Sequence, residues 1–358
     1  MFRALQLESW IDRATYGRAP RIAVGWVTAD TLRHRPIPIQ RLGRLESSLE
    51  MRIGNNARAL NSGEGGCWNE LYVPGRRYDI VVFFKAMDSS CQTEAQRIQE
   101  QGGKVIFEAN VNYFESWGEF PVAGTRPTPQ QQNDVLGMSQ LADHVVADSS
   151  YLASVAQPSA KGVTWIPDNV GWPFWQWRRL HRSHPRLRLI WCGIAQKAKH
   201  LEVLMPALQR FGHADLTIVS DRPPEILRSL ERVVPVRFIR YSEVRYARLL
   251  SRSDAIISPK FLTSSYEIAH TEYKITLGMA AGLPAVASRQ QSYVEALEHG
   301  GGGILVDSPD EWCSALERLL SSVEYRRHAG QCARNTVEAL YTPAVTAKKY
   351  LDLFSRLN

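Results

Sequence analysis

Short runs of apolar, mostly β-branched residues alternate with longer stretches of helical periodicity along this chain of 358 residues. Apolar runs that lack a polar alternation are typical of strands buried on both faces, and such strands occur in parallel sheets covered by helices. The alternation therefore predicts an α/β protein built from doubly wound parallel sheets.

The apolar runs fall into two sets, separated by a segment rich in Trp, Pro and Arg that fits neither period. The first set predicts strands at 21–27, 79–84, 104–108, 144–147 and 163–166. The second set predicts strands at 187–192, 215–219, 236–239, 254–258, 284–288 and 303–306. Since 358 residues suit two domains, we expect an N-terminal Rossmann-like domain (1–172), a linker (173–185), a second Rossmann-like domain (186–341) and a terminal helix (342–358) that returns to the first.

Helical periodicity predicts helices between and after these strands. They lie near 92–101, 133–142, 151–156, 201–211, 225–233, 243–251, 271–281, 293–299, 309–322, 324–340 and 343–357. The polar, glycine-rich segment 54–66 is predicted to be a mobile loop.

Composition narrows the classes of partner and compartment. A net charge of +7 favours an anionic partner, but the basic residues are dispersed and carry no nucleic-acid-binding motif, so nucleic acid is not expected. The five cysteines are scattered and odd in number, which predicts reduced thiols in a cytoplasmic protein. No apolar run approaches the roughly 18 to 20 residues of a membrane span, and the charged N-terminus is unlike a signal peptide.

One N-terminal pattern leaves a peripheral membrane contact open. Leu7, Trp10 and Ile11 recur at helical spacing close to Arg3 and Arg13, as in a helix that lies on the inner, anionic face of a membrane. The alternative, which we favour, is a terminal helix docked on its own domain.

The first candidate site follows the first predicted strand of the second set. Gly193 permits close backbone approach, the next helix begins with free N–H groups, and Lys197 and Lys199 add positive charge. Ligands of open α/β sheets bind beyond the carboxyl ends of the strands. The segment is thus a candidate diphosphate-binding loop, although an ordinary turn with surface lysines has the same composition.

The second candidate site lies at 258–288. Polar and charged residues, among them Tyr266, Glu267 and Lys274, crowd the start of a helix whose remainder is small and apolar. This distribution indicates a helix whose start faces a ligand while its body packs on the sheet.

The run KITLGMAAGLPAVAS at 274–288 resembles the helix and turn that line the nucleotide-sugar site in family 4 of the retaining GT-B glycosyltransferases. Further segments are similar to that family in the same order: WCG at 191–193, YVEALEHG at 293–300 with GILV at 303–306, and, in the N-terminal half, ADHVVADS at 142–149 and IPDN at 166–169. The resemblance covers about 140–340 well. It implies a GT-B fold, in which two Rossmann-like domains face a central cleft.

The chain departs from the family at two acidic positions. The usual pair of glutamates, eight residues apart, falls at Ala269 and Leu277. Since the second glutamate ordinarily holds the ribose hydroxyls, we expect Tyr266, Glu267 or Glu272 to supply part of this polar role. The resemblance also places Glu295 in the segment beside the donor.

The expected acceptor residues follow a strand of the N-terminal half. Glu108, Asn110 and Asn112 combine carboxylate and amide groups with nearby aromatic residues, which suits a sugar-binding cleft. A capped loop with packed aromatics is an equally good interpretation. Basic residues at 33–35 and Lys85 would attract an anionic acceptor or form a solvated rim.

The resemblance implies transfer of a sugar from a nucleoside diphosphate sugar to a carbohydrate or lipid-linked acceptor, with retention of configuration, in bacterial cell-surface polysaccharide synthesis. Lys274 and Lys199 are the expected catalytic cations, and Gly193, Lys197, Tyr266, Glu267 and Glu295 complete the expected donor site. Because lysines can stabilise the leaving diphosphate, we expect no metal and no cofactor other than the donor itself. A non-catalytic nucleotide-sugar-binding protein and a GT-B-like sugar-phosphate epimerase or phosphorylase remain alternatives.

Overall fold

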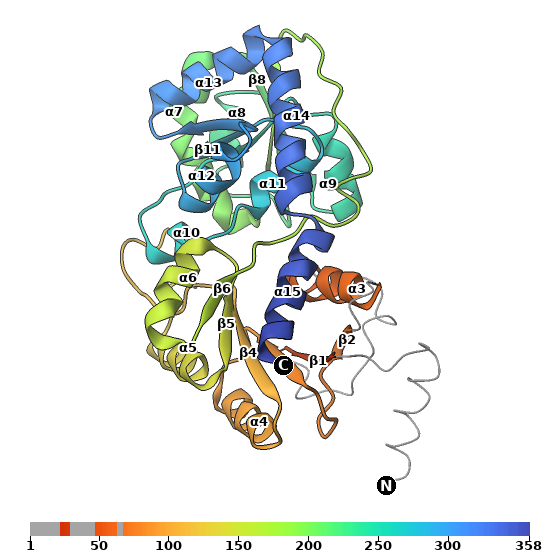
Figure 1. The fold of residues 1–358 in the computed structure, drawn as a ribbon. Helices are drawn as coiled ribbons and strands as arrows, with labels where there is room; N and C mark the ends of the chain where they lie inside the picture. Colours follow the sequence, from red (N-terminus) through yellow and green to blue (C-terminus); the bar gives the residue numbers. More distant parts are fainter. Residues whose placement is uncertain (1–21, 29–46, 63–66) are drawn as a thin grey trace.

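The computed structural model describes residues 22–28, 47–62 and 67–358. They form two six-stranded parallel sheets, one in each half of the chain, with helices on the faces of both (Figure 1). The prediction of two doubly wound α/β sheets is therefore confirmed.

The N-terminal sheet has the strand order β2-β1-β3-β4-β5-β6. Its strands are β1 (Ile22–Val27), β2 (Cys67–Leu71), β3 (Ile80–Phe84), β4 (Lys104–Ala109), β5 (His144–Ala147) and β6 (Val163–Trp165). Its helices are α2 (Ser47–Leu49), a π-helical turn at Glu50–Gly54, α3 (Asn55–Ser62), α4 (Ser89–Glu100), α5 (Pro129–Leu141), α6 (Ser150–Ala156) and a 3₁₀ turn at Gln157–Ser159.

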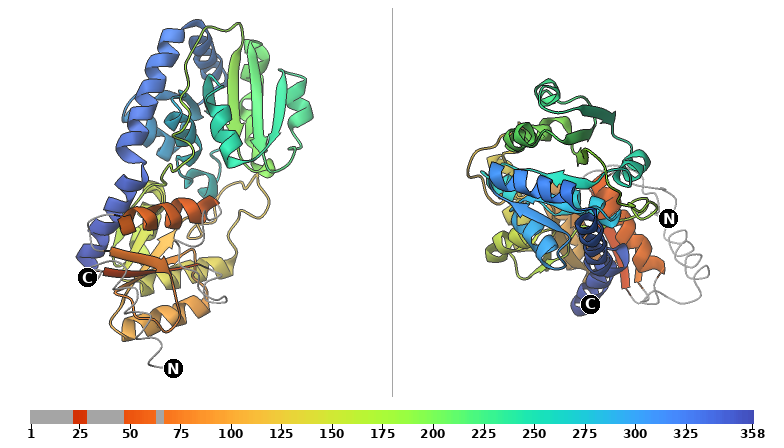
Figure 2. Two further views of the ribbon diagram at one scale, coloured as in Figure 1. Left: turned by 90° about the vertical axis from the view of Figure 1, so that its right-hand side faces the viewer. Right: turned by 90° about the horizontal axis from the view of Figure 1, so that it is seen from above.

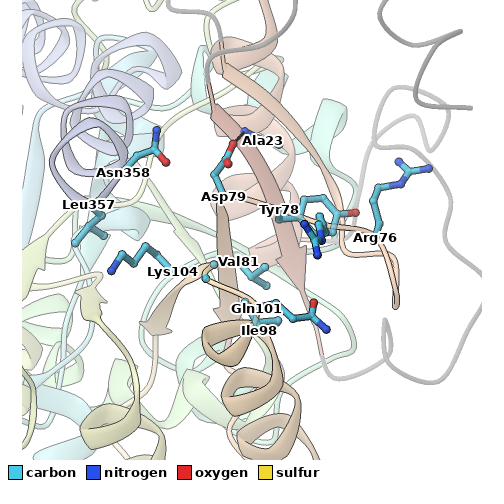
Figure 3. A pocket seen from close by; sticks show the side chains of 13 residues that line it. Ala23, Arg76, Tyr78, Asp79, Val81, Ile98, Gln101, Lys104, Leu357 and Asn358 are labelled. Atoms are coloured by element: carbon cyan, nitrogen blue, oxygen red, sulfur yellow. Dashed lines mark hydrogen bonds between the residues drawn. The ribbon is translucent and has the colours of Figure 1, made fainter. Parts of the chain in front are cut away.

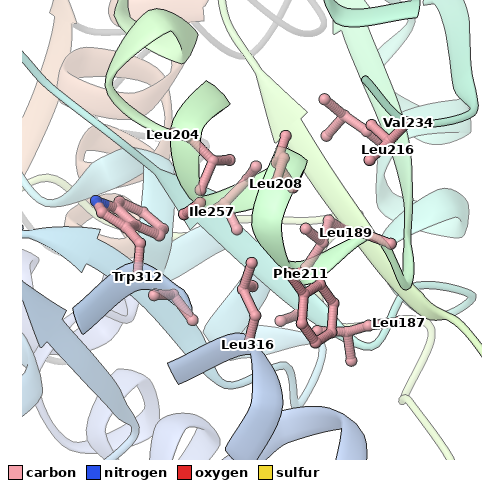
Figure 4. Close-up of a cluster of buried hydrophobic side chains, with 14 of the residues drawn as sticks. Leu187, Leu189, Leu204, Leu208, Phe211, Leu216, Val234, Ile257, Trp312 and Leu316 are labelled. Carbon is pink, nitrogen blue, oxygen red and sulfur yellow. The ribbon is translucent and has the colours of Figure 1, made fainter. Parts of the chain in front are cut away.

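The C-terminal sheet has the order β12-β11-β10-β7-β8-β9. Its strands are β7 (Leu187–Cys192), β8 (Ala214–Ser220), β9 (Val236–Arg240), β10 (Ala255–Ser258), β11 (Ala285–Ser288) and β12 (Gly303–Val306). Its helices are a 3₁₀ segment at Ala195–Val203, α7 (Met205–Phe211), α8 (Leu227–Glu231), α9 (Glu243–Leu250), α10 (Ser265–Ile268), α11 (Tyr273–Ala280), α12 (Gln291–Glu298), α13 (Pro309–Ser321) and α14 (Val323–Leu340). Figure 4 shows the core on one face of this sheet, where Leu208 of α7 and Leu316 of α13 meet Leu189 of β7.

The last helix, α15 (Pro343–Leu357), packs against the N-terminal half, after α14 has run along the C-terminal half (Figures 1 and 2). Tyr350 and Phe354 of α15 are buried with Ile53 and Ala57 in one hydrophobic cluster beside β1 and β3. A helix from the end of the chain therefore covers one face of the first sheet.

The prediction of a mobile loop at 54–66 is wrong for residues 54–62, which are helical. Ile53, Ala57 and Leu60 recur at helical spacing and are buried, so the segment is held by packing despite its polar composition. Strand β2, which the sequence did not predict, follows it and pairs with β1. Residues 63–66 lie outside the described part, as do Trp10, for which a helix is predicted, and the basic residues at 33–35.

Among the described residues, none of the helices combines the length and the apolar character needed to cross a membrane.

Candidate functional site

A cavity of about 290 Å³ lies where the carboxyl ends of the two sheets meet. Lys85 follows β3, Asp148 follows β5, and Lys260 lies just beyond β10. The lining also includes Met51, Asn110, Val111, Asn112 and Asp168 from the N-terminal half and Tyr266, Ala269, His270, Thr271, Tyr273, Lys274 and Tyr293 from the C-terminal half. This position is the one at which doubly wound sheets bind ligands.

A second cavity, of about 280 Å³, lies at the opposite edge of the N-terminal sheet (Figure 3). Its lining includes Ala23, Asp79 and Lys104, which lie at the amino ends of β1, β3 and β4. We therefore place the candidate site in the cavity between the halves and not in this one.

Two lysines, Lys260 and Lys274, line the cavity on its C-terminal side, and a third, Lys197, lies close to both. Lys260 Nζ lies 3.6 Å from Glu267 Oε2. Lys197 Nζ lies 2.6 Å from His270 Nε2 and 4.8 Å from the centre of the Tyr266 ring. Lys274 Nζ lies 5.2 Å from the centre of a Trp191 ring. Lys260 was not predicted, although it follows a strand in the same polar stretch as Tyr266.

Burial and mutual repulsion destabilise the charged form of these lysines. Burial, together with the charge of Lys197, lowers the pKa of Lys274 to about 8. Burial also lowers the pKa of Lys260, against the opposing effect of Glu267, and it lowers the pKa of Lys197. An anion bound among them would relieve this repulsion, so the cluster is a candidate anion site.

Glu267 is the carboxylate within the lysine cluster. It is 1% exposed, and its Oε1 lies 3.2 Å from His200 Nε2. Burial alone would raise its pKa, yet the proximity of His200 and the charge of Lys260 hold the pKa of Glu267 well below its usual range. Glu267 is therefore a buried counter-ion of the lysines, a position that does not suit the predicted contact with a ribose.

Two histidines support this cluster in their neutral form, because burial lowers the pKa of both. His270 Nδ1 lies 2.6 Å from the carbonyl oxygen of Tyr266 and donates to it, which leaves Nε2 to accept from Lys197. His200 Nδ1 accepts from the backbone N–H of Phe261 at 3.2 Å, which leaves the proton on Nε2, the nitrogen that lies 3.2 Å from Glu267 Oε1. Both rings thereby position a charged partner.

Gly193 lies beside Lys274, but its backbone N–H is already used. The N–H donates to Val219 O at 3.1 Å, and the N–H of Ala195 donates to the Asp221 carboxylate at 2.7 Å. A Cβ atom at Gly193 would lie 2.8 Å from the Trp191 ring and 3.2 Å from Lys274 Nζ. The glycine therefore makes room for these two side chains.

The structure separates Lys199 from the other predicted donor residues. Its side chain is exposed, whereas that of the adjacent His200 is buried. The 3₁₀ helix at Ala195–Val203 directs the two neighbouring side chains to different sides. The prediction for Lys199 is wrong because charge alone does not show which of two neighbouring side chains points inward.

On the N-terminal side, Asp148 and Asp168 line the cavity with Asn110. The Asn110 amide donates to Asp148 Oδ2. Asp168 accepts from Thr271 at 2.7 Å and pairs with Arg52 at 3.2 Å. Burial, together with the charge of Asp168, raises the pKa of Asp148 well above its usual range.

Glu108 stands behind this wall and does not line it. It is fully buried, its Oε1 lies 2.6 Å from Arg52 Nε, and its Oε2 accepts from Tyr350 of α15 at 2.7 Å. Both carboxylate oxygens are thus engaged within the protein. This corrects the expectation that Glu108 contacts an acceptor.

Several hydrogen bonds cross from one half to the other beside the cavity. Asn112 Nδ2 donates to Ser265 O at 3.3 Å, and the N–H of Glu119 donates to Thr263 O at 2.9 Å. Ser150 donates to Glu295 of α12. Asn112 and Glu295, predicted for the acceptor and the donor, therefore both take part in joining the halves.

Within the described ranges 22–28, 47–62 and 67–358, His, Cys, Asp and Glu side chains form no group of three or more that is arranged to hold a metal ion.

The sequence comparisons concern the C-terminal half. Residues 186–322 match the family described as "Glycosyl transferases group 1". D-inositol 3-phosphate glycosyltransferase of Paenarthrobacter aurescens is 31% identical over 145 residues, which are 39% of this chain and 30% of that protein. Spore coat protein SA of Bacillus subtilis is 24% identical over 129 residues, 35% of this chain and 32% of that protein. The chain thus spans about a third of the length of these curated relatives.

Solved structures share the fold over both halves. Sucrose-phosphate synthase from Thermosynechococcus elongatus superposes with a TM-score of 0.66 at 14% identity, covering 94% of this chain and 99% of that one. A S. aureus TarM structure, in complex with UDP among other ligands, has a TM-score of 0.58 at 12% identity over 84% of this chain and 58% of that one. Anabaena HepE in complex with UDP and glucose has a TM-score of 0.57 at 13% identity over 78% of each chain. Residues 186–322 therefore match the glycosyl transferases group 1 family, within a chain that has the GT-B fold.

Proposed function

We propose that the protein transfers a sugar from a nucleoside diphosphate sugar to a hydroxyl group of a carbohydrate or lipid-linked acceptor, with retention of configuration. The observation that carries the proposal is the cluster of Lys197, Lys260 and Lys274, which supplies three ammonium groups against the one carboxylate of Glu267. The fold and the group 1 segment support a donor on this side of the cavity.

The lysines would act on the leaving group. As the bond between the sugar carbon and the diphosphate oxygen breaks, negative charge builds on that oxygen, and cations in a partly dry cleft stabilise it more than water does. The acceptor oxygen forms the new bond to the same carbon, and its proton passes to the leaving phosphate. In this scheme Lys260 and Lys274 replace a metal ion, so we propose that transfer continues in the presence of a chelator.

The proposed role in cell-surface polysaccharide synthesis has one line of support, which is the name of the spore coat relative. The UDP in the TarM and HepE structures makes a uridine nucleotide the first donor to examine.

The diphosphate assignment is tested by comparing UDP with uridine as ligands of the same variants. Lys260→Met and Lys274→Met should each weaken UDP binding by about tenfold or more, as expected for a lost hydrogen bond to a charged group, while uridine binding stays unchanged. Lys348→Met, at an exposed lysine of α15, is the matched control. Equal losses for UDP and uridine, or none for either, would contradict the assignment.

Turnover separates an enzyme from a binding protein. Lys274→Ala should lower the rate of sugar transfer about a hundredfold or more in a folded variant. A wild-type protein that binds UDP but releases none from any UDP-sugar with any acceptor would instead be a nucleotide-sugar-binding protein. The configuration of the product, read by NMR, tests retention.

A further inference from the structure

Asp148 holds an unused hydrogen-bonding position in the wall of the cavity. The residue is 3% exposed, and its Oδ2 accepts from the Asn110 amide. Its Oδ1 is buried and has no hydrogen-bond partner within residues 22–28, 47–62 and 67–358. Among the described residues that line the cavity, Asp148 is the one whose side chain has a buried oxygen without a hydrogen-bond partner. A buried oxygen without a partner is unfavourable unless a ligand or a water molecule donates a hydrogen bond to it.

Two other polar side chains of the same wall, Asp168 and Asn112, are already paired. Asp168 accepts from Thr271 and pairs with Arg52. Asn112 donates to Glu115 and to Ser265 O, and its own oxygen accepts from the backbone N–H of Glu115. Asp148 Oδ1 is therefore the buried side-chain oxygen of this wall with which an incoming molecule can form a hydrogen bond.

The charge of this wall determines whether a charged or a neutral acceptor can bind there. Two carboxylates, Asp148 and Asp168, face the cavity from the N-terminal half with one ammonium group, that of Lys85. Burial lowers the pKa of Lys85, while Asp148 and Asp168 raise it, so the lysine acts as their counter-ion. A phosphate or carboxylate on the acceptor would lie against this acidic wall, whereas a hydroxyl group can pair with Asp148 in either protonation state.

We propose that the acceptor of this protein is an uncharged polyol, such as a neutral sugar, and that one of its hydroxyl groups binds Asp148 Oδ1. The proposal rests on the proposed function, because it assigns the acceptor side of the same cavity. It distinguishes this chain from its inositol phosphate glycosyltransferase relative, whose name includes a phosphorylated acceptor. Asp148 is thus a specificity-determining residue.

The test measures acceptor binding to protein that is saturated with UDP. The probes are myo-inositol, D-glucose and D-galactose, each compared with its monophosphate, and binding is followed by saturation-transfer NMR. The neutral compounds should bind at least about tenfold more tightly than their phosphates, because a phosphate close to the buried acidic side chains of Asp148 and Asp168 is disfavoured. Tighter binding of the phosphates, equal binding, or binding of neither class would overturn the proposal.

Two variants connect this preference to Asp148. Asp148→Ala should weaken binding of the neutral probes about tenfold or more, since a buried hydrogen bond is lost, while UDP binding stays unchanged. Asp148→Asn keeps the shape and a side-chain oxygen but removes the ionisable carboxyl group, so it should still bind the neutral probes while its preference for them over the phosphorylated probes falls. Asp134→Asn, on α5 and outside the cavity lining, removes the same charge as a control.

The outcomes separate this inference from the proposed function. Wild-type protein that does not bind UDP would contradict the donor assignment first. Wild-type protein that binds UDP, together with an Asp148→Ala variant that binds the neutral probes as well as wild type does, would overturn the acceptor assignment alone.

Discussion

Two effects act in opposite directions on the charge of Lys274. Burial and the neighbouring Lys197 disfavour its charge, whereas a bound diphosphate would favour it. With a pKa of about 8 in the free protein, the side chain is mostly charged at neutral pH and loses its proton as the pH rises above 8. The affinity of this side chain for an anion therefore depends on pH.

We expect UDP binding to weaken as the pH rises from about 7 to about 8.5, a range in which the uracil ring stays neutral. Lys274 is the cation involved, and since the anion stabilises the protonated lysine, binding near pH 8 should be accompanied by proton uptake. Calorimetry in buffers of different ionisation enthalpy measures both effects. The dependence should flatten in Lys274→Met, and uridine should show none. A flat wild-type profile would contradict the charge assignment.

Gly193→Val tests the space next to that lysine. The new side chain would press on the Trp191 ring and on Lys274 Nζ, because a Cβ atom already lies 2.8 Å from the first and 3.2 Å from the second. We expect UDP affinity to fall more than uridine affinity, and unfolding stability to fall by about 1–3 kcal/mol from overpacking. Equal losses of affinity for the two ligands would mean that the diphosphate lies elsewhere.

The sequence predicted residues of the cavity lining on both sides, Tyr266 and Lys274 on one and Asn110 and Asn112 on the other. Lys274 and Tyr266 could be predicted because polar residues at the start of a small-residue helix are visible in the linear sequence. The role of Glu267 was not visible, since it depends on Lys260 and His200, and His200 comes from a distant part of the chain. Asp148 could be predicted only as part of a family motif, because its free oxygen is a property of the folded cavity.

At the scale of elements, the loop after β4 crosses to the C-terminal half. Gly118 forms an isolated antiparallel bridge with Ser264, and the N–H of the next residue, Glu119, bonds to Thr263 O. Gly118 has a φ of 82°, and a Cβ atom there would lie 1.9 Å from Thr263 O. Only glycine fits both the backbone conformation and the close approach.

Gly118→Ala should therefore weaken the contact between the halves. Gly124→Ala is the matched control, because Gly124 also has a positive φ, of 77°, but a Cβ atom there would meet no other atom within 4 Å. Both variants carry the strain of a left-handed alanine, about 1 kcal/mol. Small-angle scattering of UDP-bound protein should show larger dimensions for Gly118→Ala alone. Identical curves for the two variants would show that the bridge does not hold the halves together.

Most strands could be predicted because a strand buried on both faces is a continuous apolar run, as in Ile80–Phe84. The helical segment before β2 could not, because its apolar face is narrow and its polar residues are used internally. Asn56, for example, is fully buried and donates to Arg52 O at 2.7 Å. Polar side chains usually indicate a loop, but here they form hydrogen bonds within the folded protein.

At the scale of the whole molecule, Arg52 joins three distant parts of the chain. It is fully buried, and it contacts Glu108 of β4, Asp168 beside the cavity and Tyr350 of α15. Its removal would leave two buried carboxylates without their cation. The acceptor wall and the terminal helix therefore share one supporting group.

Arg52→Met should destabilise the protein by about 3–5 kcal/mol, because breaking a buried ion pair leaves an uncompensated charge. Urea unfolding, followed by circular dichroism, measures the change. Arg289→Met, which removes an exposed pair with Asp307, should leave the midpoint unchanged. A midpoint for Arg52→Met that equals that of the control would show that Glu108 and Asp168 do not depend on this arginine.

The position of α15 also has a consequence for biosynthesis. The ribosome adds residues 343–357 after the entire C-terminal sheet, yet Tyr350 and Phe354 fill the hydrophobic cluster of the N-terminal half. Throughout translation of the second half, the nascent first half therefore presents an uncovered apolar face around Ile53 and Ala57 to solvent and to chaperones. The N-terminal half thus leaves the exit tunnel first, but its hydrophobic cluster is complete only after α15 has been synthesised.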